Sequence, residues 1–222
     1  MESTLVLLQS FDSLFPIGAF TLSNGMETYV QKEIVKDKNS LQEYLDTFIY
    51  LMPFNDLGMA SFVMQTKNFV LADSVCAASK SPVELRQGSN KLCARFIKAQ
   101  KEINRSSLDS LLQYEKLISE NKCHGMFPVA LGLYFADLKL DIKDALRFYA
   151  YSQISTLVNH AVKLVPLGQM EGQKALFYGM QKIDDAVNRA INIKEEELGS
   201  GGPGFDFRSM EHEKLYSRLY IS

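Results

Sequence analysis

The stretch that decides the fold class is residues 141–166, DIKDALRFYAYSQISTLVNHAVKLVP. Asp141 is a residue type that caps helix N-termini. After it, apolar side chains recur close to the spacing of one helix face: Leu146, Tyr149, Ile154, Leu157 and Val162. Pro166 disfavours helical geometry in the residue before it. The stretch therefore predicts one long helix that begins after Asp141 and ends before Pro166.

Helix start signals recur elsewhere in the chain. A capping residue followed three positions later by an acidic residue or glutamine marks a helix N-terminus, as in Asn39 with Gln42, Ser81 with Glu84, and Ser106 with Asp109. The first of these helices should end near Met52, because Pro53 follows it. We expect a last helix from about Gln169 to Lys194. The period-two alternation of half-buried strands is hard to find, so the sequence predicts an all-α fold with a single compact domain of about eight to ten helices.

The composition is that of an ordinary globular protein. Of the 222 residues, 46% are hydrophobic and 23% charged, and the 24 Lys and Arg nearly balance the 26 Asp and Glu. The chain lacks the basic patch that nucleic acid requires, and its longest apolar stretch, residues 127–136, is too short to span a membrane. The N-terminal residues do not resemble a signal peptide, and three cysteines without a CxxC pair favour a reducing compartment. We therefore expect a cytoplasmic protein that binds neither nucleic acid nor a membrane.

Residues 199–204, GSGGPG, are typical of a flexible linker. They divide the chain into a helical body, residues 1–198, and a C-terminal tail, residues 205–222. We expect the tail to be flexible, to dock on a partner, and to be removable with little change in the melting temperature. The alternative is a tail that packs on its own body as a structural strap, in which case its removal would lower the melting temperature markedly.

The tail carries residue types suited to docking. Leu215 and Leu219 lie four residues apart, as do Tyr216 and Tyr220, so on a helix they would form one apolar stripe. Arg218 adds a planar group that suits a carboxylate or backbone carbonyls. An apolar stripe on a mobile segment is expected to capture a groove on a partner protein.

The sequence offers few candidates for chemistry. Its potential metal ligands and nucleophiles are far apart: His124, His160 and His212, and Cys76, Cys93 and Cys123. Because His160 lies on a largely apolar helix, we expect it to be a hydrogen-bonded structural residue. No phosphate-binding glycine loop, GxSxG or HExxH motif occurs. We expect no catalytic residue, no metal site and no cofactor.

A dense turn motif lies near the start of the chain, in residues 15–27, FPIGAFTLSNGME. Proline and glycine are the residues that tight turns require, and we interpret three of them as structural turn residues: Pro16, Gly18 and Gly25. Ser23 or Asn24 is expected to cap the helix that follows. Aromatic and apolar residues crowd around this turn, which is typical of a docking surface but also of packing on the core.

Arg147 and Tyr151 lie one turn apart on the long predicted helix. At this spacing the two side chains share a face, so they can pair with each other or contact another chain. A face exposed to solvent is the alternative, and the sequence leaves the two interpretations equally supported.

The motifs together resemble the urease accessory protein UreF family. Residues 15–27 are similar to its N-terminal signature, although Met26 replaces the usual leucine. Four more segments match in order along nearly the whole chain: residues 81–86, 128–132, 165–173 and 216–220. Within the third of these, Glu171 stands where aspartate is more typical.

The resemblance implies an all-helical, non-catalytic homodimer that bridges UreD (also called UreH) and the nickel-carrying GTPase UreG, and so supports nickel insertion into apo-urease. It places Arg147 and Tyr151 at the dimer interface. It also implies a surface for UreD that comprises Glu27, Tyr29, Leu215, Tyr216, Arg218, Leu219 and Tyr220. Because the potential ligands are scattered, we expect the purified protein to bind nickel weakly or not at all.

Two other functions compete with this interpretation. The protein would be a regulator of GTP hydrolysis by UreG if it supplied an arginine finger from an exposed loop. However, Arg86 and Arg95 lie inside a predicted helix, and docking explains Arg218 better. A small-molecule enzyme with an unrecognised pocket is the third possibility.

Overall fold

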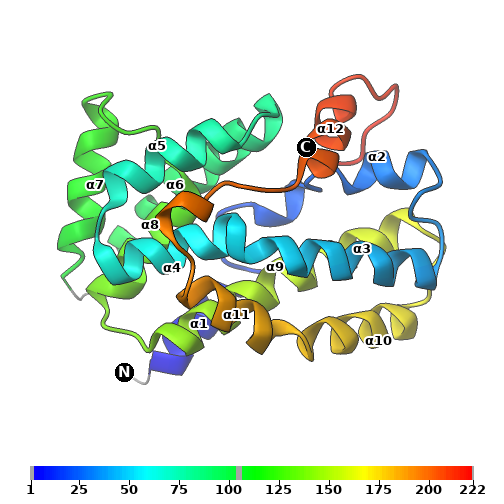
Figure 1. The fold of residues 1–222 in the computed structure, drawn as a ribbon, viewed down its shortest axis with the longest axis horizontal. Coiled ribbons are helices and arrows are strands. Elements are labelled where there is room, and N and C mark those ends of the chain that lie inside the picture. The colour runs from blue at the N-terminus through cyan, green and yellow to red at the C-terminus, as the bar shows by residue number, and fades with distance from the viewer. Residues whose placement is uncertain (1–2, 104–106, 222) are drawn as a thin grey trace.

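Helices make up the regular structure of the residues that the computed structural model describes, which are 3–103 and 107–221 (Figure 1). No strand occurs within these ranges, so the all-α prediction is confirmed. The α-helices are α1 (Ser3–Ser10), α2 (Met26–Gln31), α3 (Lys38–Leu51), α4 (Asp56–Thr66), α5 (Phe69–Ser79), α6 (Val83–Ile103), α7 (Asp109–Ser119), α8 (Phe127–Asp137), α9 (Ile142–Leu164), α10 (Gln169–Met180), α11 (Ile183–Ile191) and α12 (Pro203–His212). Three short 3-10 helices are η1 (Ala19–Thr21), η2 (Met52–Phe54) and η3 (Glu195–Glu197).

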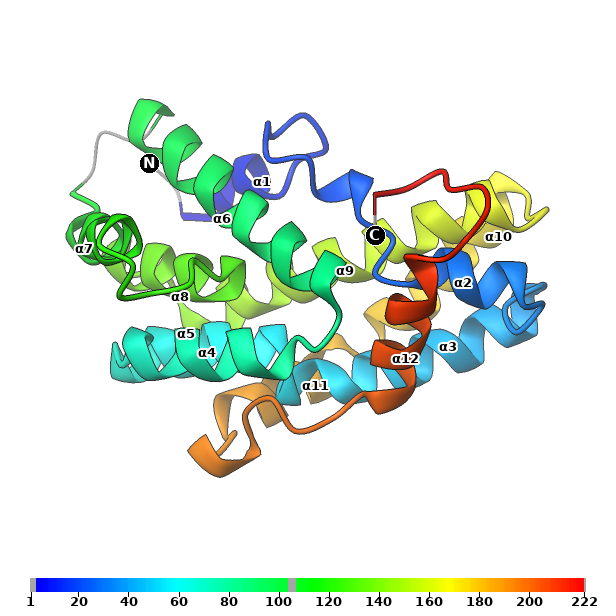
Figure 2. The ribbon, with the colours of Figure 1, turned by 90° about the horizontal axis from the view of Figure 1, so that it is seen from above.

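Helix α8 forms the centre of the core. Every residue from Phe127 to Phe135 is buried, as expected for a helix that is apolar on all sides. Figure 2 shows α8 between α6 and α4, with α7 at one end, and α8 contacts all three. Gly132 allows α4 to approach closely, because a Cβ atom there would lie 2.6 Å from the carbonyl oxygen of Ala60. No helix in the described ranges has the length and apolar character needed to cross a membrane.

Helix α9 begins and ends where the sequence predicts. The Asp141 side chain accepts a hydrogen bond of 3.0 Å from the backbone N–H of Asp144, which satisfies one of the free donors of the first turn. At the other end, Val165 is extended immediately before Pro166. The long-helix prediction is therefore confirmed, and α9 spans much of the long dimension of the molecule (Figure 1).

Helix α3 ends as predicted but begins differently. It ends at Leu51, just before η2 and Pro53. Its cap is Asp37 and not Asn39, because the Asp37 carboxylate accepts the backbone N–H of Ser40 at 2.9 Å, while the Ser40 hydroxyl accepts the N–H of Asp37. The sequence contains both possible capping boxes, and the box with a carboxylate is the one that forms. Helix α6 begins at Val83, two residues after the predicted capping residue Ser81. The third predicted capping residue, Ser106, lies outside the described residues.

The predicted last helix, residues 169–194, is two helices. Helix α10 packs against α3 and α9, and α11 packs against α9 and α3 and also against α4 and η2. The turn is closed by a hydrogen bond of 3.0 Å from the Lys182 N–H to the carbonyl of Gly179. The Lys182 ammonium group is held by the Asp46 carboxylate and the Tyr178 hydroxyl. Tertiary packing therefore overrides the helical pattern at this point.

A buried carboxylate, that of Asp73 in α5, fixes the turn that leads into α8. It accepts the hydroxyl of Tyr114 in α7 and the backbone N–H groups of three consecutive residues, His124 (2.5 Å), Gly125 (3.0 Å) and Met126 (3.1 Å). Asp73 is 1% exposed. Burial raises the pKa of the Tyr114 hydroxyl, so this group remains a donor. One side chain therefore ties α5, α7 and the start of α8 together.

We predict that Asp73→Asn destabilises the fold. The amide group that replaces one carboxylate oxygen cannot accept, so at least one buried backbone N–H loses its partner, at a cost of about 2–4 kcal/mol. Urea denaturation measures this change in the free energy of unfolding. Asp185→Asn, a matched substitution at an exposed site of α11, should change it by only a few tenths of a kcal/mol. Equal stability of the two variants would show that Asp73 does not have this role.

Candidate functional site

The N-terminal turn motif packs on α6. Phe15 and Ile17 are buried and Pro16 is exposed. Gly18 has a φ of +77°, a conformation that other residues rarely adopt. The Arg95 guanidinium of α6 donates a hydrogen bond of 3.1 Å to the carbonyl of Ile17 and fills the space beside Gly18. The turn is thereby held against the α6 surface.

Gly25 brings the C-terminal region against the start of α2. It lies at the N-cap position with a φ of +80°, so the expected cap from Ser23 or Asn24 does not form. A Cβ atom at Gly25 would lie 2.6 Å from the hydroxyl oxygen of Ser209 in α12. Glycine is needed here both for the turn and for the close approach of α12.

Two carboxylates from distant helices enclose one histidine at the α12 end. His212 is fully buried, with Nδ1 at 2.7 Å from a Glu84 oxygen in α6 and Nε2 at 3.2 Å from a Glu27 oxygen in α2. The Arg218 guanidinium then donates to the other Glu84 oxygen at 2.7 Å. We call these four residues, Glu27, Glu84, His212 and Arg218, the clasp. It joins the first and last parts of the chain, as Figure 2 shows for α12 and α2.

The last described residues are held to the body largely through their backbone. We call residues 213–221 the strap. Glu27 accepts the backbone N–H groups of Leu219 (2.7 Å) and Tyr220 (3.2 Å). The Ile221 N–H donates to the carbonyl of Thr21 at 2.9 Å, and Gln31 donates to the Ser217 carbonyl at 2.9 Å. Backbone contacts of this kind fix the path of the strap while using few of its apolar side chains.

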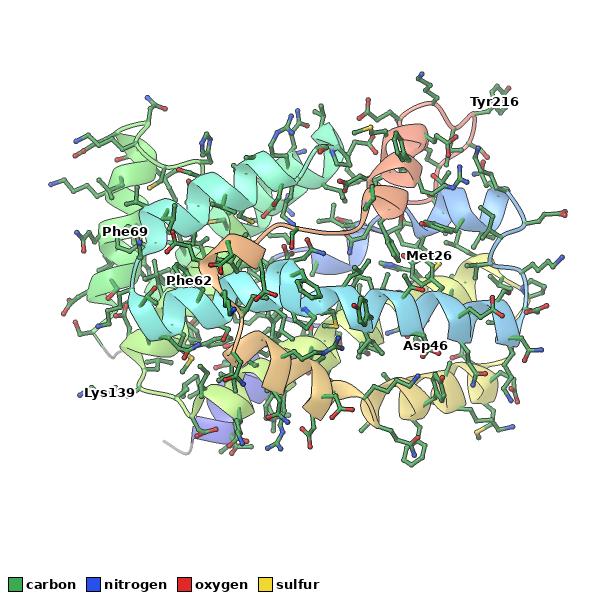
Figure 3. The ribbon with its side chains drawn as sticks, in the orientation of Figure 1. Met26, Asp46, Phe62, Phe69, Lys139 and Tyr216 are labelled. Atoms are coloured by element: carbon green, nitrogen blue, oxygen red, sulfur yellow. The ribbon has the colours of Figure 1, made fainter. Side chains whose placement is uncertain are left out.

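The strap side chains point two ways. Tyr220 is buried, and its ring lies on that of His160 with centroids 4.3 Å apart. Tyr216 is fully exposed, at the outer edge of the molecule in Figure 3, and Leu219 is 64% exposed. The predicted apolar stripe does not form, because residues 213–221 adopt turns and bends and not a helix. Leu215 is half-buried.

His160 has the structural role expected from its helix. Its Nε2 atom makes a hydrogen bond of 3.0 Å to the carbonyl of Phe20. Burial lowers the pKa of the His160 imidazole to about 4, so the ring is neutral at physiological pH.

Tyr29 is part of an aromatic cluster that anchors the start of α12. Its ring centroid lies 5.0 Å from that of Tyr44 and 5.6 Å from that of Phe205, and such ring pairs add stability beyond the buried area. Partial burial raises the pKa of its hydroxyl. The residue that the resemblance assigns to a partner surface therefore also contacts the C-terminal region of its own chain.

The glycine-rich run follows a defined path over a cavity that is lined by both apolar and polar side chains. The Gly199 N–H donates to the carbonyl of Phe54 at 2.7 Å. A cavity of about 160 Å³ lies between this region and the body, lined by Gly201 and Ser209 on one side and by Asn55 and Lys80 on the other. The predicted flexibility of this linker stays a prediction, but these contacts and those of the strap favour the alternative of a tail packed on its own body.

Arg147 and Tyr151 lie on the exposed side of α9, away from the clasp. Arg147 donates to Asp184 of α11 at 2.7 Å and to Asp144 at 3.4 Å, and the hydrogen bond to Asp184 raises the pKa of its guanidinium. Tyr151 is 40% exposed. The arginine is thus oriented by α11, and the tyrosine presents an aromatic surface to solvent.

Reactive groups are few in this structure. Within the described residues, no three His, Cys, Asp or Glu side chains are placed to hold a metal ion. All three cysteines are buried, and burial raises the pKa of the Cys76 thiol to about 12 and that of Cys123 to about 11. Thiols with such values remain protonated at neutral pH and react slowly.

Sequence reasoning missed two members of the clasp, Glu84 and His212. The capping-box spacing from Ser81 already explained the presence of Glu84 in the sequence. His212 was one of three histidines that lie far apart in the sequence. Their meeting depends on contacts across 128 residues of sequence. No local pattern encodes such a contact.

We predict that truncation after Gly204 lowers the melting temperature by several degrees. It removes most of α12 and the strap, including three buried residues, Ser209, His212 and Tyr220, and it leaves the Glu27 carboxylate buried without its donors. Differential scanning calorimetry measures the shift. An unchanged melting temperature would instead support the independent, flexible tail.

Comparison with known proteins gives one consistent family. The UreF family model matches residues 35–178. The chain is 36% identical over 223 residues to the urease accessory protein UreF of Actinobacillus pleuropneumoniae serotype 5b (strain L20), covering 97% of both chains. It is 34% identical over 223 residues to the UreF of Haemophilus influenzae (strain PittGG), covering 97% of this chain and 94% of that protein.

A more distant relative extends the match to the full length. The chain is 30% identical over 229 residues to the urease accessory protein UreF of Bacillus sp. (strain TB-90), and the alignment covers 100% of both. The segments that carry the sequence resemblance lie within this alignment. The chain therefore belongs to the UreF family of urease accessory proteins, which are accessory factors and not enzymes.

Proposed function

We propose that this protein assembles the urease maturation complex by binding other proteins. It forms a homodimer and bridges UreD (UreH) and the GTPase UreG, and the assembly supports nickel insertion into apo-urease in the cytoplasm. The observation that carries the proposal is the outward-facing part of the strap. Tyr216, Leu219 and Ile221 are exposed on a segment whose backbone is already bound to the body. An apolar surface fixed in advance loses little conformational entropy when a partner binds.

The exposed face of α9 supports the homodimer. Tyrosine and arginine are enriched among the residues that dominate interface energy, and Tyr151 is exposed while Arg147 is oriented by its ion pair with Asp184. We propose that this face meets the same face of a second copy about a two-fold axis, the commonest arrangement in homodimers.

Regulation of GTP hydrolysis by UreG is the second candidate function. The contacts of the arginine side chains support it less well than they support an assembly role. Each arginine in the described ranges already has a partner: Arg86 with the carbonyl of Lys80, Arg95 with that of Ile17, Arg147 with Asp184, Arg189 with the Tyr50 ring, Arg208 with Glu211, and Arg218 with Glu84. An arginine finger must be free to reach the phosphates of the nucleotide. Single-turnover GTP hydrolysis by UreG, with and without this protein, separates the two functions.

We predict that Tyr151→Asp converts the dimer to a monomer at micromolar concentration. The new carboxylate would be desolvated in the interface without a partner, which weakens association by roughly a hundredfold or more. Sedimentation velocity measures the mass, and circular dichroism checks that the variant stays helical. Tyr216→Asp, the same substitution on the strap, should leave the dimer intact. A helical Tyr151→Asp protein that remains dimeric would place the interface elsewhere.

We also predict that Leu219→Asp weakens the capture of UreD without affecting the fold. The Leu219 side chain is mostly exposed, while its backbone N–H is the group that Glu27 holds, so the body keeps its contacts. Surface plasmon resonance with immobilised UreD should show a loss of affinity of at least tenfold, and the melting temperature should stay within about 1 °C of the wild-type value. Wild-type affinity in this variant would exclude the strap as the docking surface.

A further inference from the structure

The cavity of about 160 Å³ lies where the C-terminal region packs on the helical body. Helices α3, α4, α5, α6, α8 and α9 contribute residues to one side of it, and the glycine-rich run and α12 contribute to the other. An engineered apolar cavity of about 150 Å³ is large enough to bind benzene. The cavity in this protein therefore has room for a six-membered ring with a short side arm.

The walls of the cavity suit the apolar part of such a molecule. Three aromatic rings line it, those of Phe48, Phe127 and Phe205, together with the thioethers of Met52 and Met59. Side chains of these two kinds make favourable contacts with a ring. Because the five residues come from α3, α8, α12, η2 and α4, these walls meet only in the folded chain with α12 in place.

The lining also carries hydroxyl groups that can bind a polar group. The Ser209 side chain is 2% exposed, and its oxygen has no hydrogen-bond partner among the described residues. A buried hydroxyl without a partner is destabilised relative to a hydrated one. Ser89 accepts the backbone N–H of Phe127 at 2.9 Å, which leaves its own hydrogen for another acceptor. Both hydroxyl groups are thus available to a ligand.

The charges on the lining favour a cation. Lys80 and Asp56 form an ion pair of 2.6 Å, so their charges cancel. Asp206 of α12 makes no ion pair within the described ranges, and the Lys80 ammonium group attracts it only from beyond ion-pair distance. One negative charge is therefore left without a close partner at the cavity. A cationic ligand would balance this charge, whereas an anion would add to it.

We propose that this cavity binds a small amine with an aromatic or branched aliphatic body. The body packs against the phenylalanine rings, and the protonated amine binds the Asp206 carboxylate and the Ser209 hydroxyl. Such a ligand contacts both α12 and the helices beneath it, so its binding stabilises the packing of the C-terminal region. The site lies within one chain and does not depend on the partners proposed above.

Three small molecules of nearly equal size test the proposal: benzylamine, benzyl alcohol and benzoate share one ring and differ in charge. Isothermal titration calorimetry of the full-length protein near pH 7 should give benzylamine a dissociation constant below about 1 mM, which is within reach of a ligand of about eight non-hydrogen atoms. Benzyl alcohol should bind about tenfold more weakly, because it lacks the charge that pairs with Asp206. Benzoate should not bind at about 10 mM. An absence of benzylamine binding, or benzylamine affinity no higher than that of benzyl alcohol, would overturn the proposal.

Two substitutions locate the binding. Asp206→Asn removes the charge at a half-buried position, so it should weaken benzylamine about tenfold and leave benzyl alcohol unchanged, while Asp185→Asn, the same change at an exposed site of α11, should alter neither affinity. Leu85→Trp fills the cavity from α6 and should abolish the binding of both, unlike Leu14→Trp at an exposed site. Wild-type benzylamine affinity in Asp206→Asn would contradict the site, and this variant provides the test if Leu85→Trp does not fold.

Hydrogen–deuterium exchange separates this site from one elsewhere on the body. The Asp206 N–H donates to the carbonyl of Gly202 at 3.0 Å, so its protection reports the first turn of α12. A ligand that binds only when α12 is packed lowers the opening equilibrium by a factor of one plus the ratio of its concentration to its dissociation constant. Benzylamine at about ten times its dissociation constant should therefore raise the protection of α12 by about tenfold. Unchanged protection with benzylamine bound would show that α12 does not form part of the site.

Discussion

The buried carboxylate of Glu27 is the interaction on which the arrangement of the two chain ends depends. It lies in the short helix α2, next to a turn that only glycine can form without strain, and it accepts hydrogen bonds from His212, Leu219 and Tyr220. A buried carboxylate is stable only when its oxygens are satisfied. Its need for donors therefore explains why the last residues of the chain return to the first. Asp73 plays the corresponding part inside the helical body, where one carboxylate fixes the turn before α8.

The sequence predicts the helices well where the determining signals are local. Asp141 and Pro166 set the ends of α9, because capping and proline geometry act within a few residues. Helix α3 ends next to Pro53 as predicted, although Met52 keeps helical geometry and the chain continues into η2. The predictions differ from the structure where distant contacts decide. The break near Lys182 precedes α11, which packs on α4 and η2 in addition to the helices that α10 contacts, and Asp37 competes with Asn39 for the same helix start.

The candidate site was predictable only in part, for the same physical reason. The glycines of the N-terminal turn are identified by composition, and Glu27, Tyr29 and the strap residues by family resemblance. The contacts within the clasp could not be predicted in this way. The hydrogen bonds that Glu84 makes with His212 and Arg218 join residues far apart in the sequence and arise only in the tertiary fold. The four-residue spacing in the strap suggested a helix, but Glu27 binds consecutive backbone N–H groups there, and a helix would use such groups internally beyond its first turn.

Different groups of the strap serve a structural role and a binding role. Its backbone and Tyr220 face the body, whereas the side chains of Tyr216 and Leu219 face solvent. A flexible tail would pay the entropy of ordering when a partner binds, but a strap held by Glu27 has already been ordered by folding.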